Sequence, residues 1–446
     1  ILKTIGPLFL DELRAQADKL VSNPATPVRK LEEFRDSLAA HIFCDPACGA
    51  GNFLLTAYKE LRRIETDLIV AIRQRRGETG MSLNIEWEQK LSIGQFYGFE
   101  LNWWPAKIAE TAMFLVDHQA NKELANAVGR PPQRLPITIT AHIVHGNALA
   151  LDWTEALPKA VGETFIFGNP PFIGQDTRTK QQLEEMKAVW RRKNISRLDY
   201  VTCWHIKSLD LFSTRNGRFA FVTTNSITQG EQVPLLFGPI FAAGWRIRFA
   251  HRTFSWDSDA PGKASVHCVI VGFDRAHEPR PQLWDYPNVS SAPVAVPVER
   301  VINAYLVDGP NVLVQKMTSP ISCEIKPAVL GAMAKDGGGL IVEAQDVQEA
   351  LDDPIAAKYL RPYVGSRELV RGLSRWCLWM VDLDPADVQA STFLRSRIEQ
   401  VRAYRTTSSA PTTRSMAKIP HLFAQRYRPQ TDFLCVPSVV SENRPY

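Results

Sequence analysis

Short apolar runs alternate with longer amphipathic repeats along the first 275 residues of the chain. Each run has the length of a buried strand, and apolar side chains at helical spacing follow it, as at Leu54, Ala57 and Leu61 after the first run. The runs that we expect to form strands are residues 39–44, 96–100, 137–146, 165–168, 218–224, 247–254 and 265–273. This alternation predicts an α/β domain with a doubly wound, mainly parallel sheet.

The remainder of the chain has a different pattern. Prolines recur with little periodicity between residues 277 and 297, which predicts a linker. We therefore expect a first domain of residues 1–275 and a second domain of residues 276–446. In the second domain, a strand at 376–381, a helix and a loop at 408–418 predict an α+β fold.

The helix predicted in the second domain has one apolar and one basic face. We expect Leu394, Ile398 and Val401 on the apolar face and Arg395, Arg402 and Arg405 on the other. Residues 354–446 contain 14 Lys and Arg against 7 Asp and Glu, whereas residues 276–353 contain 5 against 11. The formal charge of the whole chain is +5, which permits an anionic partner without requiring one. The basic end is therefore a candidate phosphate-contacting surface.

The run at 165–168 leads directly into Asn169-Pro170-Pro171-Phe172. Prolines have no N–H to donate, so they end the sheet ladder and leave neighbouring carbonyls free. The side-chain oxygen of Asn169 and the carbonyl of Pro170 can then hold both hydrogens of an exocyclic amino group. Phe172 offers a flat face on which a base can stack. The simpler alternative is a turn that ends a strand.

The run at 39–44 leads into a glycine-rich turn and a helix. Gly49 and Gly51 let the backbone approach a ligand and point helix-start amides at it, as in nucleotide-binding units. Glu100 ends the next run, where a carboxylate suits the two hydroxyls of a ribose. Asn147, after the third run, can accept from an adenine amino group or simply start a turn.

Four motifs occur in a fixed order, Asp45-Pro-Ala-Cys-Gly-Ala-Gly51, Gly98-Phe-Glu100, Gly146-Asn-Ala-Leu149 and Asn169-Pro-Pro-Phe172. Together they resemble the motifs of γ-class DNA adenine-N6 methyltransferases, whose sheet is Rossmann-like. Further matches at 221–226, 254–263 and 375–379 narrow the resemblance to the methyltransferase and target-recognition part of Type IIL-like restriction–modification enzymes.

The resemblance implies S-adenosyl-L-methionine as the cofactor and double-stranded DNA as the partner. It implies catalytic roles for Asn169, Pro170, Pro171 and Phe172. The implied cofactor-binding residues are Asp45, Ala47, Gly49, Gly51, Asn52, Phe53, Glu100, Leu101, Asn147, Ala148 and Asn169. The chain departs from the family at Ala50, where serine is preferred, and it lacks an upstream motif that contacts the methionine end of the cofactor.

Several assignments stay open or are rejected on the sequence. Phe254 and Trp256 are alternative second walls for the base. The charged stretch 177–196 is a solvated helix face or, less simply, a phosphate contact. Rival functions are methylation of an RNA base or a protein glutamine, and DNA binding without catalysis. We interpret the acid-x-Lys form at 324–326 as chance and expect any nuclease outside this chain.

Composition restricts the remaining possibilities. Seven scattered cysteines predict reduced thiols in a cytosol and no disulfides. The resemblance implies that this cytosol is the cytoplasm of a prokaryote. Cys44 and Cys48 lack a second ligand pair at a zinc-site spacing, so we expect no metal. No apolar run approaches the length of a membrane span. Because the chain starts at Ile1 and stops within a stretch that the family continues, we expect a fragment.

Overall fold

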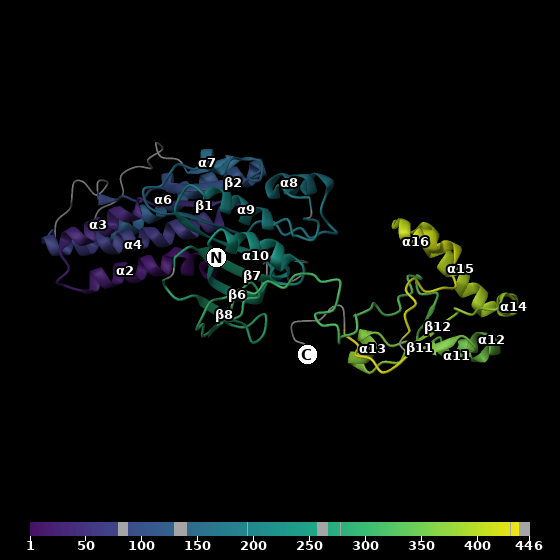
Figure 1. Ribbon diagram of the computed structural model, residues 1–446. Coiled ribbons are helices and arrows are strands. Elements are labelled where there is room, and N and C mark those ends of the chain that lie inside the picture. The colour runs from purple at the N-terminus through teal and green to yellow at the C-terminus, as the bar shows by residue number, and fades with distance from the viewer. Residues whose placement is uncertain are drawn as a thin grey trace. The chain divides into compact units, whose positions relative to one another are not determined.

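The computed structural model of the protein describes residues 1–78, 88–128, 141–193, 195–256, 266–276, 278–428 and 430–436. The chain divides into two compact units, Ile1–Lys316 and Met317–Tyr446 (Figure 1).

The helices of the first unit are α1 Leu2–Ile5, η1 Gly6–Leu10, α2 Asp11–Ser22, α3 Val28–Leu38, α4 Asn52–Arg76, η2 Ile93–Gln95, α6 Trp103–Val128, α7 Trp153–Ala156, α8 Lys180–Trp190, α9 Thr202–Leu211, η3 Asn225–Thr228 and α10 Gln232–Ala242. Its strands are β1 Ile42–Asp45, β2 Phe96–Glu100, β3 His142–His145, β4 Thr164–Gly168, β5 Gly217–Thr224, β6 Arg246–Trp256, β7 Val266–Asp274, β8 Gln282–Asp285 and β9 Val294–Val296.

These strands form one sheet in the order β3-β2-β1-β4-β5-β7-β6-β8-β9. The first five strands in this order, from β3 at the edge to β5, all run parallel to one another. Strand β7 pairs antiparallel with both β5 and β6. The predicted doubly wound, mainly parallel sheet is confirmed. The expected hairpin is also present as β6 and β7, although its connection, predicted at 257–263, lies outside the described residues.

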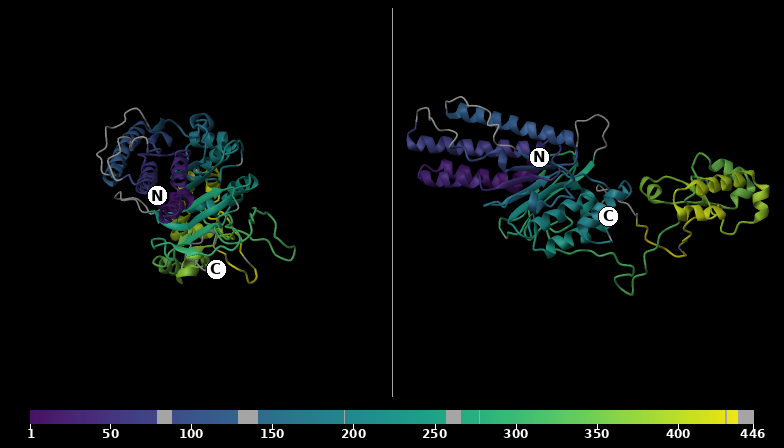
Figure 2. Two further views of the ribbon diagram at one scale, coloured as in Figure 1. Left: turned by 90° about the vertical axis from the view of Figure 1, so that its left-hand side faces the viewer. Right: turned by 90° about the horizontal axis from the view of Figure 1, so that it is seen from above.

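Helices cover both faces of this sheet. Successive side chains of a strand point to opposite faces, so each face presents apolar side chains that need to be covered. Phe43 of β1 packs with residues of η1, α3, α4 and α6, whereas Ile42 and Cys44 pack with residues of α8, α9 and α10. Figure 2 shows the long helices α4 and α6 running side by side over the first face. The two apolar layers leave the ends of the strands as the place for polar chemistry.

The predicted linker at 277–297 is wrong. Its prolines flank two short strands instead, because β8 pairs parallel with β6 and β9 pairs antiparallel with β8. Proline is tolerated beside such strands at the edge of a sheet, where ladder hydrogen bonds are not needed on both sides. The first compact unit consequently extends past residue 275 to Lys316.

The second unit has its own small sheet and core. Its elements are β10 Ile341–Val342, α11 Val347–Asp352, α12 Pro354–Ala357, β11 Leu360–Pro362, α13 Ser366–Arg371, β12 Trp376–Leu378, α14 Pro385–Ala390, α15 Thr392–Thr407, α16 Pro411–Ser415 and η4 Met416–Lys418. The strands form an antiparallel sheet in the order β10-β12-β11. Leu394, Ile398 and Val401 of α15 pack in the core of the unit, which is α+β as predicted.

Two expectations about this unit are corrected. Arg405 lies on the buried face of α15, not on the basic face, because it follows Val401 by one helical turn. The loop predicted at 408–418 contains α16 and η4, with Pro411 in the first helical turn, where a proline is compatible with a helix. Arg395 and Arg402 are exposed, as predicted.

Candidate active site at the carboxyl ends of the parallel strands

The predicted site residues gather at one edge of the parallel sheet. Asp45, Glu100 and Gly168 are the last residues of β1, β2 and β4, three neighbouring strands. Asn169 follows β4 directly, and Asn147 lies two residues beyond β3. Since parallel strands end on the same side, this edge is the place where ligands bind in doubly wound sheets.

The glycine-rich turn between β1 and α4 holds the Glu100 carboxylate. Gly49 and Gly51 have φ values of +52° and +88°, which favour glycine. The Gly49 N–H donates to Oε2 of Glu100 at 3.0 Å, and the Asn102 N–H donates to Oε1 at 2.8 Å. A Cβ on Gly49 would meet no atom within 4 Å, so space lies open beside the turn. Backbone donors and a fixed carboxylate thus meet at this space.

Asp45 is buried beneath the turn and contacts the next strand. Its Oδ1 accepts the Ala47 N–H at 3.0 Å. Gly168 has a φ of +154°, and a Cβ there would lie 2.3 Å from Oδ1 of Asp45, so only glycine lets the carboxyl approach this strand. Burial, opposed by the Ala47 N–H and reinforced by the Glu100 carboxylate, raises the pKa of Asp45 to about 7.

The segment after β4 presents an unsatisfied polar atom. The Oδ1 atom of Asn169 is buried, yet it accepts no hydrogen bond within the part of the chain that the structure describes. Pro170 is buried, Pro171 is exposed and Phe172 is half-buried. A buried acceptor without a donor costs about 1–3 kcal/mol, so such an atom is typical of a site where a ligand supplies the donor.

Downstream residues fix the exit of this segment. The Ile173 N–H donates to Oδ1 of Asp199 at 3.1 Å, and the Tyr200 N–H donates to the Ile173 carbonyl at 3.1 Å. The Asp199 N–H in turn donates to Gln232 at the start of α10. Sequence reasoning missed Asp199, because nothing in its local pattern indicates a partner so far back along the chain.

Asn147 makes two hydrogen bonds through its side-chain amide. Its Oδ1 accepts the Leu149 N–H at 2.9 Å, which forms the turn considered from the sequence. Its Nδ2 donates to Oε1 of Glu185, on α8, at 3.0 Å. The cofactor contact of Asn147 stays a prediction, and Glu185 is a second residue that sequence reasoning missed.

The other predicted cofactor residues surround the same turn. Phe53 and Ala148 are buried, Ala47 is half-buried and Asn52 is exposed at the start of α4. Leu101 is 63% exposed directly after Glu100, so its side chain is accessible beside the carboxylate.

Phe254 and Trp256 are the two candidate residues for the second wall of the base pocket. Phe254 is buried in the core, its ring lies 5.2 Å from that of Tyr286, and the Lys3 ammonium lies 4.8 Å from its centre. Phe254 therefore packs as a core aromatic. Trp256 ends β6, and its side chain lies outside the described residues.

Cations in the charged stretch at 177–196 have partners within the chain. Arg178 donates to the carbonyls of Ser196 and Leu198, Lys187 pairs with Glu184, and Arg191 pairs with Asp210. These contacts favour a structural role for the three side chains, in line with the simpler of the two alternatives.

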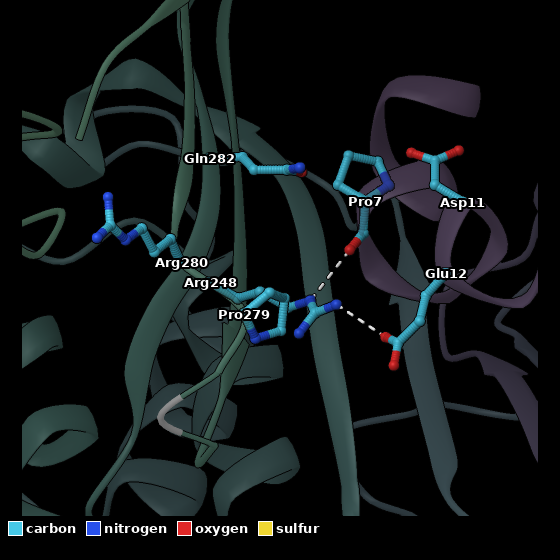
Figure 3. A pocket seen from close by; sticks show the side chains of 7 residues that line it. All are labelled: Pro7, Asp11, Glu12, Arg248, Pro279, Arg280 and Gln282. Atoms are coloured by element: carbon cyan, nitrogen blue, oxygen red, sulfur yellow. Dashed lines mark hydrogen bonds and ion pairs between the residues drawn. The ribbon is translucent and has the colours of Figure 1, made fainter. Parts of the chain in front are cut away.

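A hollow of about 280 Å³ lies at the opposite end of the sheet (Figure 3). Its lining residues are Pro7, Asp11, Glu12, Arg248, Pro279, Arg280 and Gln282. Arg248 donates to the Pro7 carbonyl at 3.1 Å and to Glu12 at 2.9 Å. Because Arg248 lies near the start of β6, this hollow is separate from the carboxyl-end site.

Comparison with known families shows to which family the chain belongs. The family described as "MmeI, DNA-methyltransferase domain" matches residues 19–285, and the family described as "MmeI, target recognition domain" matches residues 308–446. The chain belongs to the MmeI DNA-methyltransferase family. The resemblance inferred from the motifs is confirmed.

Relatives of this MmeI-family chain include proteins about twice its length. DNA methyltransferase A of Bacillus subtilis (strain 168) is 33% identical over 450 residues, which are 100% of this chain and 49% of that protein. The Type IIL restriction–modification enzyme MmeI, solved in complex with DNA, is 38% identical with a TM-score of 0.86, covering 96% of this chain and 56% of that one. The chain thus spans about half the length of these relatives.

The described residues of the MmeI-family chain also bear on metal binding, membrane insertion and disulfide formation. Within the described ranges, no group of three or more His, Cys, Asp and Glu side chains could hold a metal ion. No described helix is both long and apolar enough to cross a membrane. All seven cysteines are free thiols.

Proposed function

We propose that the chain transfers a methyl group from S-adenosyl-L-methionine to N6 of an adenine flipped out of duplex DNA, at a specific sequence. Family membership supports methyl transfer to DNA. The observation that supports N6 is the buried, unpartnered Oδ1 of Asn169 at the end of β4. An exocyclic amino group supplies the donor that this atom lacks.

The residues at the carboxyl end of the sheet fit the proposed methyl donor. Gly49 leaves open space beside the N–H groups of the turn, and Glu100 offers a carboxylate at the end of the adjacent strand. Both oxygens of Glu100 already accept backbone N–H bonds and retain lone pairs for ribose hydroxyls. We assign Asp45, Gly49, Gly51, Glu100 and Asn147 to hold the donor. When bound, S-adenosyl-L-methionine supplies an electrophilic methyl group on a sulfonium.

The role of Asn169 and Pro170 is orientation of the amine. In the proposed reaction, Oδ1 of Asn169 and the Pro170 carbonyl accept the two N–H groups of the adenine amine. These bonds localise the nitrogen lone pair and direct it at the methyl carbon. Phe172 stacks on the base and holds it in line. The alkylated amine is strongly acidic and loses its proton readily, so no strong general base is required, and catalysis comes from positioning and electrostatics.

We propose that the second unit reads the DNA. The matching relative MmeI was solved in complex with DNA, and the target-recognition family covers this unit. Arg395 and Arg402 are exposed on α15 and can contact phosphate or base edges. Because DNA methyltransferase A, a relative of this chain, is a protein of Bacillus subtilis, we infer that this protein acts in the cytoplasm of a prokaryote, where free thiols are typical.

Labelled S-adenosyl-L-methionine tests the proposal. The full-length protein is incubated with duplex DNA, RNA or a protein extract, and the products are digested and separated by mass spectrometry. We expect label in N6-methyladenine from duplex DNA alone. Label in RNA or in glutamine would favour the rival methyltransferase classes, and DNA binding without donor binding would favour a non-catalytic subunit.

A further inference from the structure

The side chain of Asn147 is an amide, which can take two orientations of nearly identical shape. The oxygen and nitrogen of an amide differ little in size but have opposite hydrogen-bonding roles. Only the orientation that offers Oδ1 can accept from the amino group of adenine. In the opposite orientation, Nδ2 of Asn147 would face the amino group of adenine, and both groups are hydrogen-bond donors.

Glu185 supports one of these orientations. Its Oε1 accepts from Nδ2 of Asn147 at 3.0 Å, while the Leu149 N–H donates to Oδ1 at 2.9 Å. An ionised carboxylate accepts hydrogen bonds and cannot donate, so Glu185 can face only the nitrogen of the amide. One lone pair of Oδ1 then remains for a further donor.

Glu185 is itself held in place by its neighbours. The Tyr200 hydroxyl donates to Oε2 at 2.5 Å, and Gln181 donates to Oε1 at 3.1 Å. Burial and the adjacent carboxylate raise the pKa of Tyr200, so its hydroxyl keeps its proton and donates. The ring of Tyr200 packs against Trp204, whose Nε1 donates to the Pro46 carbonyl in the glycine-rich turn at 3.0 Å.

We propose that Glu185 is a positioning residue that fixes the Asn147 amide with its oxygen facing the adenine of the methyl donor. The proposal rests on the proposed function, in which Asn147 contacts that adenine. Glu185 lies outside the recognised motifs, on the helix that follows the Asn169 segment. It gives the chain a means of recognising adenine with an amide.

Two ligands measure this recognition directly. S-adenosylhomocysteine has an amino group at position 6 of its base, and S-inosylhomocysteine has a carbonyl there. Calorimetry on the full-length protein gives the ratio of the two affinities. We expect the wild type to prefer the adenosyl ligand and Glu185→Ala to lower that ratio roughly three- to tenfold, the effect of one neutral hydrogen bond.

Matched variants separate orientation from general damage. Glu185→Gln retains an oxygen that accepts from Nδ2, so the ratio should persist. Glu184→Gln removes an exposed carboxylate one residue away, which forms an ion pair with Lys187, and it should leave the ratio unchanged. A folded Glu185→Ala protein that keeps the full ratio overturns the proposal. A wild type without any preference instead contradicts the adenine contact of the proposed function.

Exchanging the amide of Asn147 and the carboxylate of Glu185 tests the pair even if Glu185→Ala does not fold. Asn147→Asp places two carboxylates at hydrogen-bonding distance and should weaken the adenosyl ligand about tenfold or more. The double variant Asn147→Asp with Glu185→Gln restores a donor opposite an acceptor. We expect it to recover most of the lost affinity, and the absence of recovery overturns the proposal.

Discussion

The two ends of the nine-stranded sheet treat their polar groups in opposite ways. At the amino end, Arg218 pairs with Glu12 and Glu163, and Arg248 pairs with Glu12 and Asp274. At the carboxyl end, Asn169 keeps a buried oxygen without a donor among the described residues, and burial raises the pKa of Asp45. The charged side chains named at the amino end are paired with one another, whereas the carboxyl end keeps a buried amide oxygen that awaits a donor.

This difference shows why a hollow in the surface need not be the reactive site. In the hollow beside Glu12, Arg248 already donates to Glu12 and to the Pro7 carbonyl, so this guanidinium has its partners before any ligand arrives. A site that binds and orients a substrate needs groups whose partners arrive with that substrate. The carboxyl end has such groups. Variants of Asn169, Asp45 and Glu12 test this contrast, and variants of Arg405 and Arg402 distinguish a buried from an exposed arginine in the second unit.

The largest effect is expected for Asn169→Ala. Methyl transfer should fall by roughly 10³-fold or more, because the oriented acceptor acts on the reacting amine. The affinity for S-adenosyl-L-methionine should be nearly unchanged. Glu100→Ala is the matched variant at the same edge, and it should weaken donor binding first. Calorimetry and transfer rates at saturating donor distinguish the two, and loss of donor binding in Asn169→Ala would refute this division of roles.

Arg405, in the second unit, is a buried cation whose hydrogen-bond donors have partners within the protein. Its guanidinium donates to five carbonyls, those of Ala334, Lys335, Met416, Ile419 and Leu422. Arg405→Met should destabilise the unit by about 3 kcal/mol or more, because buried carbonyls lose their donors. Arg402→Met, at an exposed position of the same helix, should cost about 0.5 kcal/mol or less. Hydrogen exchange of the α15 amides measures both changes.

Asp45 predicts a pH dependence of stability. The folded chain holds its proton up to a pKa of about 7, against 3.8 in a free side chain. More protons are therefore bound in the folded state between these values, and the contribution of Asp45 to stability falls as pH rises from about 4 to about 7. Asp45→Asn should lack this fall. Denaturation of both proteins across this range tests the sign, and a difference that is independent of pH contradicts the account.

Glu12 tests the amino end. Glu12→Gln weakens the pairs with Arg218 and Arg248, but the side chain is half exposed, so we expect a loss of about 1 kcal/mol or less. Methyl transfer should remain at the wild-type rate. Glu33→Gln, in an exposed pair with Arg29, serves as a control with almost no effect. A large loss of transfer in a folded Glu12→Gln protein would mean that the amino end of the sheet takes part in the reaction.

The last prediction concerns DNA binding by Arg402. Its side chain is exposed and, among the described residues, forms an ion pair with Glu399, one turn earlier on α15. If Arg402 contacts phosphate, Arg402→Ala should reduce the salt slope of DNA affinity by about 1. If it reads a base, the loss is about 1–3 kcal/mol at one base pair. Affinity measured against salt on matched and mismatched duplexes tells these apart, and an unchanged affinity excludes both roles.

The sequence alone predicts which residues lie at the ends of strands. It does not predict which distant segments contact one another. Asp45, Glu100 and Asn169 end or follow apolar runs, so topology alone places them at one edge. Glu185 and Asp199 act through tertiary contacts that no local pattern encodes.

Errors in the second half of the chain have particular physical causes. The segment at 277–297 pairs at a sheet edge, where short strands have weak patterns and tolerate neighbouring prolines. Arg405 has the helical spacing of a core residue, and only its charge suggested exposure. A buried arginine is stable there because backbone carbonyls from two other segments surround it, and sequence does not reveal that they meet.

Sequencing of modified bases tests the central claim most directly. Full-length protein and its Asn169→Ala variant are expressed in cells that lack other adenine methyltransferases, and their genomic DNA is compared. The account predicts N6-methyladenine at one recurring sequence with the wild type and none with the variant. Unmodified adenine in both samples, or equal modification in both, would contradict the assignment of the reaction to the carboxyl end of the sheet.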